Sequence, residues 1–233
     1  MVFDNYQFLN FKGKESKIPA DEIPEWADEL DNINNFTSNK ELYDLYHHNN
    51  TNINDFEIGK ALNINYKRRV FIARSKSYHD LVVVIKALNI KYKKEAINEI
   101  EIMKITASDN IIQIFDHFTD ENYIYIIMEY APYGNLYDFY ISGNRRVSDI
   151  IAKKLMIQII SAVKKCHDLN IIHRDIKPEN FVIGDDNKIK LLDFGQSEFI
   201  DKFNSSRQTG TIEYVSPENL CGKGINPSID IWC

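Results

Sequence analysis

The chain has 233 residues, carries a net charge of −6 at neutral pH and has a sequence pI near 5.6. This length is enough for one or two compact units, and the acidic balance gives no general attraction to nucleic acid or to an anionic membrane. The three cysteines are widely spaced, and the apolar runs are too short to cross a bilayer. We therefore expect a cytoplasmic or nuclear protein with free thiols and with no nucleic-acid or membrane partner.

Residues 1–54 are polar and acidic, and Pro19 and Pro24 interrupt any regular pattern. This composition favours an extension that is mostly disordered. Within it, residues 23–30 have apolar side chains at helical spacing after a proline, so a short helix that docks on the core or on a partner is the alternative.

Short β-rich runs separated by turns fill residues 55–130. The runs 81–86, 111–118 and 123–128 contain the β-branched and aromatic residues that strands favour. Residues 95–103, by contrast, have a helical period. The pattern predicts a small, β-rich unit with one inserted helix.

A long amphipathic helix is predicted after Ser148, because this N-capping residue precedes an apolar stripe formed by Ile151, Leu155, Ile159, Ala162, Val163 and Cys166. The helix leads to the stretch Ile-His-Arg-Asp-Ile-Lys-Pro-Glu-Asn at residues 172–180. A hairpin around the turn at residues 184–187 then leads to Asp-Phe-Gly at residues 193–195. Either motif alone occurs by chance, but their order and spacing make the pattern specific.

The linked motifs at residues 172–180 and 193–195 resemble the catalytic core of a eukaryotic protein kinase. The resemblance implies an α+β fold with two lobes, in which a β-rich small lobe covers residues 55–130 and a helical large lobe covers residues 131–233. In the family the large lobe continues beyond the helix that begins at residues 230–232. We therefore expect an incomplete, C-terminally truncated large lobe that exposes apolar surface of the long helix.

The resemblance also assigns roles in phosphoryl transfer. Asp175 would accept the proton of the substrate hydroxyl, Lys177 would lie near the transferred phosphate, and Thr211 would bridge these two residues. Asn180 and Asp193 would hold Mg²⁺, since carboxylate and amide oxygens suit this ion. The implied cofactors are ATP and Mg²⁺.

Other residues are implied to bind ATP. Lys86 ends the strand-like run 81–86 and would contact the α- and β-phosphates while it is paired with Glu99. The backbone of the hinge segment that includes Glu129 and Ala131 would receive the adenine.

The glycine-rich loop is the main departure from the family pattern, because its three glycines align with Asn63, Asn65 and Arg68. Asparagine is the non-glycine residue that best tolerates positive φ, where an ordinary residue costs roughly 1–2 kcal/mol, so the two asparagines would cover the ATP phosphates and weaken nucleotide binding only mildly. The arginine fits less well sterically, although it places positive charge beside the phosphates. The alternative is a plain hairpin that covers no ligand.

Residues 193–218 resemble the activation segment of serine/threonine kinases and end in the pattern Gly-Thr-x-x-Tyr-x-x-Pro-Glu. The Lys-Pro-Glu-Asn string at residues 177–180 also points to a serine or threonine acceptor. Arg174 could engage a phosphorylated loop. The candidate phosphorylation sites are Ser205, Ser206 and Thr209.

Matches at residues 55–60, 129–134 and 210–214 resemble the Aurora group in particular, although the threonine that Aurora kinases phosphorylate aligns with Arg207. The sequence thus favours an ATP-dependent serine/threonine protein kinase with a protein substrate and, as a further expectation, an activating protein partner. The glycine-free loop and the incomplete large lobe favour the alternative, a catalytically impaired kinase-like fragment that acts as a binding or scaffold module.

Overall fold

The computed structural model describes residues 51–77, 81–142, 147–184, 188–202, 210–221 and 226–233. Most of the extension expected to be disordered, residues 1–50, lies outside the described residues. Its last residues form the capping box of η4 (Ile53–Asp55), a 3-10 turn that leads into the first strand. None of the described helices is long and apolar enough to span a membrane.

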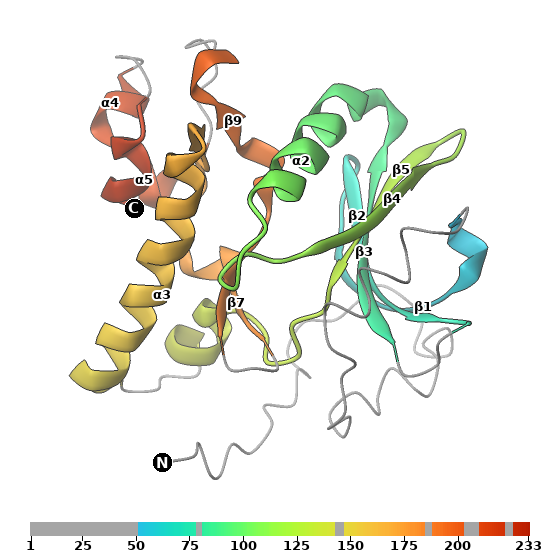
Figure 1. The fold of residues 1–233 in the computed structure, drawn as a ribbon, viewed down its shortest axis with the longest axis horizontal. Helices are drawn as coiled ribbons and strands as arrows, with labels where there is room; N and C mark the ends of the chain where they lie inside the picture. The colour runs from blue at the N-terminus through green and yellow to red at the C-terminus, as the bar shows by residue number, and fades with distance from the viewer. Residues whose placement is uncertain (1–50, 78–80, 143–146, 185–187, 203–209, 222–225) are drawn as a thin grey trace.

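A five-stranded antiparallel sheet forms one half of the molecule, with the strand order β1-β2-β3-β5-β4 (Figure 1). The strands are β1 (Phe56–Ile64), β2 (Arg68–Ser75), β3 (Val82–Asn89), β4 (Ile114–Thr119) and β5 (Tyr123–Glu129). The strands predicted at residues 81–86 and 123–128 are therefore confirmed. The strand expected from residue 111 starts later, because Ile111 forms an isolated bridge with Leu191 in the other half of the molecule, where the Ile112 amide donates to the Leu191 carbonyl.

Helix α2 (Lys93–Ile105), which follows the short turn η5 (Ile90–Tyr92), confirms the helix predicted at residues 95–103. It packs beside β3, β4 and β5 and also contacts η8 (Phe194–Gln196) in the second half. Its inward face buries Ala96, Glu99, Ile100, Ile102 and Met103. The helix thus places the charged side chain of Glu99 in the contact between the two halves.

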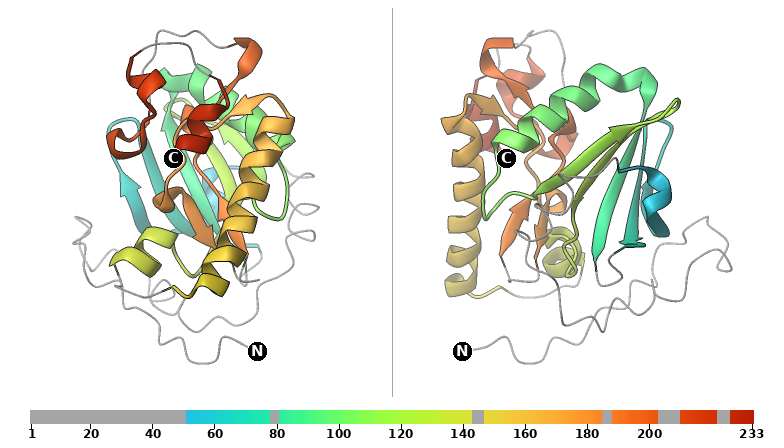
Figure 2. Two further views of the ribbon diagram at one scale, coloured as in Figure 1. Left: turned by 90° about the vertical axis from the view of Figure 1, so that its left-hand side faces the viewer. Right: turned by 45° about the vertical axis from the view of Figure 1, so that its right-hand side comes forward.

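Helix α3 (Asp149–Asp168) lies on the far side of the second half, away from the five-stranded sheet (Figures 1 and 2). It follows the π-helix η6 (Tyr137–Ser142), and Ser148 caps it by accepting a hydrogen bond from the Ile151 amide at 3.4 Å. The predicted stripe faces inward, with its members Ala162, Val163 and Cys166 buried. The opposite face exposes Ile150, Met156, Ile157 and Ile160, so the expected exposure of apolar surface is confirmed.

Two short two-stranded sheets lie between α3 and the large sheet (Figures 1 and 2). One pairs β6 (Ile171–Ile172) with β9 (Glu198–Phe199), and the other pairs β7 (Phe181–Ile183) with β8 (Ile189–Leu191). The remaining elements are η7 (Pro178–Asn180), η9 (Ile200–Lys202), η10 (Ile212–Tyr214), α4 (Pro217–Leu220) and α5 (Ser228–Trp232). Residues 173–180 thus connect β6 to β7, and residues 193–195 follow β8.

One apolar cluster extends from α2 and β3 through β8 to α3, and Phe194 is fully buried in it. A smaller cluster, which includes Phe56, Ile85 and Phe115, lies within the five-stranded sheet. The α+β class predicted from the sequence is confirmed. The shared cluster holds the segments 173–180 and 193–195 at the junction of the β-rich and helical halves.

Candidate active site

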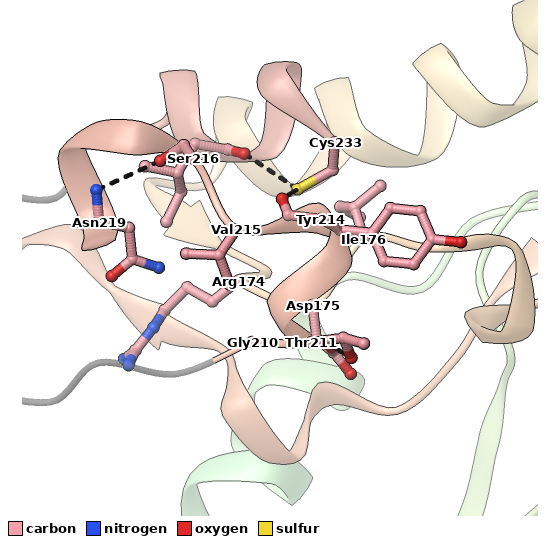
Figure 3. A pocket seen from close by; sticks show the side chains of 11 residues that line it. Arg174, Asp175, Ile176, Gly210, Thr211, Tyr214, Val215, Ser216, Asn219 and Cys233 are labelled. Atoms are coloured by element: carbon pink, nitrogen blue, oxygen red, sulfur yellow. Dashed lines mark hydrogen bonds between the residues drawn. The ribbon is translucent and has the colours of Figure 1, made fainter.

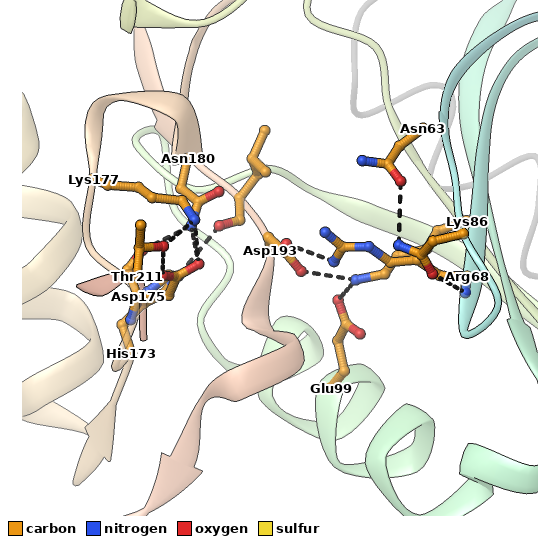
Figure 4. Close-up of polar contacts among 12 residues, drawn as sticks. Asn63, Arg68, Lys86, Glu99, His173, Asp175, Lys177, Asn180, Asp193 and Thr211 are labelled. Carbon is orange, nitrogen blue, oxygen red and sulfur yellow. Dashed lines mark hydrogen bonds and ion pairs between the residues drawn. The ribbon is translucent and has the colours of Figure 1, made fainter. Parts of the chain in front are cut away.

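Four polar residues form a cluster, called the acceptor cluster here, on the helical side of the junction (Figure 4). The hydroxyl of Thr211 donates to Asp175 Oδ1 at 2.8 Å, and Lys177 Nζ lies 2.6 Å from Thr211 Oγ1 and 2.9 Å from Asp175 Oδ2. Asn180 Nδ2 donates to the backbone oxygen of Asp175 at 2.7 Å and to its Oδ2 at 2.9 Å. The carboxylate of Asp175 is therefore fixed in orientation by three neighbours.

The backbone beneath this cluster is held by Asp230 of α5. The Asp230 carboxylate accepts hydrogen bonds from the amides of His173 and Arg174, at 2.9 and 2.8 Å. Arg174 has a φ of 70°, a left-handed conformation that non-glycine residues rarely adopt. The buried carboxylate that binds both amides stabilises this unusual turn, which projects Asp175 toward the junction.

Four charged residues form a second cluster, called the phosphate cluster here, on the side of the five-stranded sheet (Figure 4). Lys86 of β3 pairs with Glu99 of α2, and both side chains are buried. Lys86 Nζ also lies 2.9 Å from Asp193 Oδ1, while Arg68 Nη1 lies 2.7 Å from Asp193 Oδ2. Asp193 is the member of the phosphate cluster that lies nearest to the acceptor cluster (Figure 4).

Asp193 and the two cations of this cluster stabilise each other's charged forms. Burial acts to raise the pKa of Asp193, but the charges of Lys86 and Arg68 outweigh burial and hold the pKa far below its usual range. Burial would lower the pKa of Lys86, yet Asp193 and Glu99 reverse this direction and raise it. Asp193 is therefore anionic and Lys86 cationic at neutral pH.

Gly195 packs closely against the phosphate cluster. A Cβ at this position would lie 3.2 Å from Asp193 Oδ1 and 3.4 Å from Glu99 Oε2. The second distance is an ordinary contact, but the first is tight, so a side chain at residue 195 would require the Asp193 carboxylate to shift by a few tenths of an ångström.

The β1-β2 loop closes in a different way from the one the sequence suggested. Among the described residues, the non-glycine positions with positive φ are Asn170, Arg174 and Asp193, so the expectation of positive φ at Asn63 and Asn65 is wrong. Asn65 Oδ1 instead accepts from the amides of Lys67 and Arg68, each at 2.9 Å, in a side-chain-capped turn.

Asn63 and Asn65 do not join the phosphate cluster, because they are exposed and bond to each other at 3.4 Å. The side chain that reaches the cluster is Arg68, for which the sequence predicted a poor steric fit together with positive charge beside the phosphates. Strand pairing provides the signal that was missing. Arg68 pairs with Leu88 and Val70 pairs with Lys86, so alternation along the strands puts Arg68 and Lys86 on the same face of the sheet.

The predicted hinge residues lie at the end of β5 and just beyond it. The side chain of Glu129 does not face a ligand site, because its Oε1 lies 2.5 Å from Lys190 Nζ and its Oε2 accepts from the Gln113 amide at 3.2 Å. Its role in adenine binding therefore remains a prediction for its backbone, as it does for Ala131. The buried Glu129–Lys190 pair was not foreseen.

The predicted regulatory residues are only partly within the described residues. Ser205, Ser206 and Thr209, like Arg207, lie outside them. Arg174 is buried, and its Nη1 lies 2.7 Å from Glu198 Oε2 of β9. A phosphate that engaged Arg174 would therefore compete with an acidic partner that the sequence did not reveal.

A small pocket lies behind the acceptor cluster, between residues 174–176, the segment 210–219 and α5 (Figure 3). Tyr214, Val215 and Ile229 supply much of its apolar wall, and Cys233 Sγ donates to the Tyr214 carbonyl at 3.0 Å. The pocket includes neither Lys86 nor Asp193. It shares Asp175 and Thr211 with the acceptor cluster and has no residue of the phosphate cluster in its lining.

Asn180 and Asp193 fit a magnesium site. The Leu192 amide donates to the Asn180 carbonyl at 2.9 Å, which ties Asn180 to the residue that precedes Asp193. Because the Asn180 amide nitrogen donates to Asp175, its side-chain oxygen is the atom that would accept a metal ion. One amide oxygen and one carboxylate suit Mg²⁺, which takes its other ligands from phosphates and water.

Residues 45–233 match the family described as protein kinase domain. The chain is 33% identical to "Aurora kinase C" of Mus musculus over 78% of this chain and 67% of that protein. It is 36% identical to "Aurora/IPL1-related protein kinase 2" of Caenorhabditis elegans, over 77% of this chain and 60% of that protein. It is 37% identical to "Aurora kinase" of Eremothecium gossypii, over 78% of this chain and 51% of that protein.

The fold, the two clusters and these matches together define the class, and the chain belongs to the protein kinase family. Within the family it is similar to the Aurora kinases, so the Aurora-like resemblance inferred from the sequence is confirmed. The chain spans between about half and two thirds of the length of these relatives.

Proposed function

We propose that the chain binds ATP with Mg²⁺ between the phosphate and acceptor clusters and transfers the γ-phosphate to a serine or threonine hydroxyl of a protein substrate. The observation that carries this proposal is the contact of Asp175 with both Thr211 and Lys177. This contact joins the aspartate of the His-Arg-Asp motif to the lysine and threonine that the resemblance to serine/threonine kinases implied.

The acceptor cluster supplies what phosphoryl transfer needs from the protein. Phosphoryl transfer depends on positioning and charge neutralisation more than on covalent chemistry. Asp175 would orient the acceptor hydroxyl and take its proton, because its carboxylate is already held by Thr211 and Asn180. Lys177 would neutralise charge on the phosphate that moves past it.

The phosphate cluster supports the other half of the proposal. Lys86, fixed by Glu99, presents a cation on the face of β3 that lines the junction. Asp193 and Asn180 would hold Mg²⁺, which neutralises phosphate charge when it is bound. The backbone of the hinge at Glu129 and Ala131 would receive the adenine.

The alternative, a kinase-like module that does not catalyse transfer, is favoured by one specific observation. Arg68 forms an ion pair with Oδ2 of Asp193, which is a proposed metal ligand. The loop that precedes Arg68 also contains no glycine. A fixed Arg68–Asp193 pair would exclude Mg²⁺ and leave a binding or scaffold function.

Two measurements on the purified chain test the proposal. A thermal melt with Mg²⁺ and ATP at about 100 times the dissociation constant should show stabilisation of about 2.7 kcal/mol, which neither component alone should reproduce. Radiolabelled ATP should then transfer phosphate to a degenerate serine/threonine peptide mixture. Stabilisation by Mg²⁺ and ATP without transfer to peptide or protein would favour the alternative, and no stabilisation would contradict the nucleotide site itself.

A further inference from the structure

Arg68 is built into the junction and is not an incidental surface residue. It is the first residue of β2, and its backbone is fixed by hydrogen bonds with Asn65 and by pairing with Leu88. Its side chain is 30% exposed and points toward the same space as Lys86. The position of the guanidinium is therefore set by the strand that carries it.

The two cations of the phosphate cluster differ in how firmly they are held. Lys86 has two acidic partners, Glu99 and Asp193, whereas the ion pair that Arg68 makes within the described part of the chain is with Asp193. A Mg²⁺ ion that binds Asp193 Oδ2 must displace one cation from that atom. The displaced cation is Arg68, because it is the one on Oδ2.

Two backbone amides of the β1-β2 turn are already used within the turn and do not face a ligand. In a glycine-rich loop, free backbone N–H groups donate to phosphate oxygens. In this turn, the amides of Lys67 and Arg68 donate to the side chain of Asn65. A phosphate at this turn therefore loses these two donors, and a side chain can replace them.

We propose that Arg68 is a ligand of the nucleotide phosphates, with its side chain held on Asp193 until Mg²⁺ takes that carboxylate. This inference rests on the proposed nucleotide site. A planar guanidinium with several donors is well suited to bidentate contact with phosphate oxygens. Once Arg68 leaves Asp193, the phosphates bound by the same Mg²⁺ would give its guanidinium new anionic partners, in addition to the nearby charges of Glu99 and Asp175. A side chain thus replaces the backbone donors of the missing glycines.

Calorimetric titration of the chain with ATP and, separately, with adenosine tests the proposal, in buffer with excess Mg²⁺. Arg68→Ala should weaken ATP binding about 10- to 100-fold, the usual effect of losing a hydrogen bond between charged groups. Adenosine binding should not change, because adenosine carries no phosphate, and it also reports that the variant is folded. Arg68→Lys should lie between the wild type and Arg68→Ala.

Arg69→Ala is the matched control. It removes the same charge one residue away, but Arg69 lies over the ring of Tyr123 at 5.4 Å and alternation places it on the other face of the strand. Its ATP affinity should equal that of the wild type. ATP binding by Arg68→Ala that is equal to or tighter than wild-type binding overturns the inference. Arg68 would then either make no contact with the phosphates or block Asp193 from binding Mg²⁺.

Two further outcomes separate this inference from the proposed function. A wild-type chain that binds neither ATP nor adenosine overturns both. An ATP affinity that depends on Arg68 in a chain that transfers no phosphate supports the role of Arg68 and contradicts only the proposed transfer.

Discussion

The acceptor cluster and the phosphate cluster face each other across one junction, but they follow the family pattern to different degrees. Asp175, Lys177 and Asn180 lie within six residues of one loop, and the contacts among them and with Thr211 use the residue types that the resemblance implied. The phosphate cluster keeps Lys86, Glu99 and Asp193 but adds Arg68 in place of a glycine. The comparison indicates that the acceptor side is standard and that any unusual property of this chain arises on the phosphate side.

Asp175→Asn tests the acceptor side and should have the largest effect. The amide keeps the size of the carboxylate and can still accept from Thr211, but it cannot take a proton from the acceptor hydroxyl. Phosphotransfer should fall about 10²- to 10⁴-fold, while the affinity for ATP with Mg²⁺ stays within about threefold, as measured by peptide phosphorylation and calorimetry.

The control for this variant is Asp168→Asn on the exposed end of α3, where the carboxylate pairs only with solvent-exposed Lys164 among the described residues. Its phosphotransfer rate should match that of the wild type. If Asp175→Asn retained the wild-type rate, the acceptor side would not contain the proton acceptor.

Lys86→Met tests the phosphate side. It leaves Glu99 and Asp193 without their shared cation, and breaking a buried ion pair in this way costs roughly 3–5 kcal/mol. We expect a loss of this size in the free energy of unfolding measured with urea, together with loss of ATP binding under conditions in which the variant is still folded.

Two matched variants sharpen this result. Lys190→Met breaks the other buried pair, with Glu129, and should lose similar stability while it retains ATP binding, because the adenine contact proposed for Glu129 is made by its backbone and not by its side chain. Lys164→Met breaks the exposed pair with Asp168 and should change stability by no more than about 1 kcal/mol. If Lys190→Met also lost ATP binding, loss of either buried pair would disable the junction, and Lys86 would have no special role.

The difference between the clusters also explains what the sequence could predict. Asp175, Lys177 and Asn180 were found because their spacing within one loop is local, and α3 was found because its cap and apolar stripe are local too. The Arg68–Asp193 and Glu129–Lys190 contacts join residues 125 and 61 positions apart and depend on strand register, which composition does not reveal.

The prediction for the loop was wrong for a related reason. It assumed that a residue aligned with glycine must adopt the backbone of glycine, whereas the side chain of Asn65 caps the turn without positive φ. The roles of Ser205, Ser206 and Thr209 stay predictions, because these residues lie outside the described part of the chain.

His173 connects the two clusters, and its titration should have the smallest effect. Its Nε2 lies 3.2 Å from the Leu192 carbonyl, next to Asp193, while its Nδ1 accepts from the Asp175 amide at 3.4 Å, so this arrangement requires the neutral ring. Burial lowers the pKa of His173 below its usual value of 6.5, although the carboxylates of Asp230, Asp193 and Asp175 oppose the shift.

Below pH 6.5 the unfolded chain therefore binds a proton at this position that the folded chain resists, and the free energy of unfolding should fall as the pH drops from 7 to 5. The contribution of His173 is at most about 1.4 kcal/mol for each pH unit. In urea titrations across this range, His173→Gln should show a shallower fall than the wild type, and exposed His117→Gln corrects for any general effect of losing one histidine. If the free energy of unfolding changed equally with pH in the wild type and in His173→Gln, the folded protein would not hold the His173 ring neutral, and the contacts of this ring with Leu192 and Asp175 would not link the two clusters.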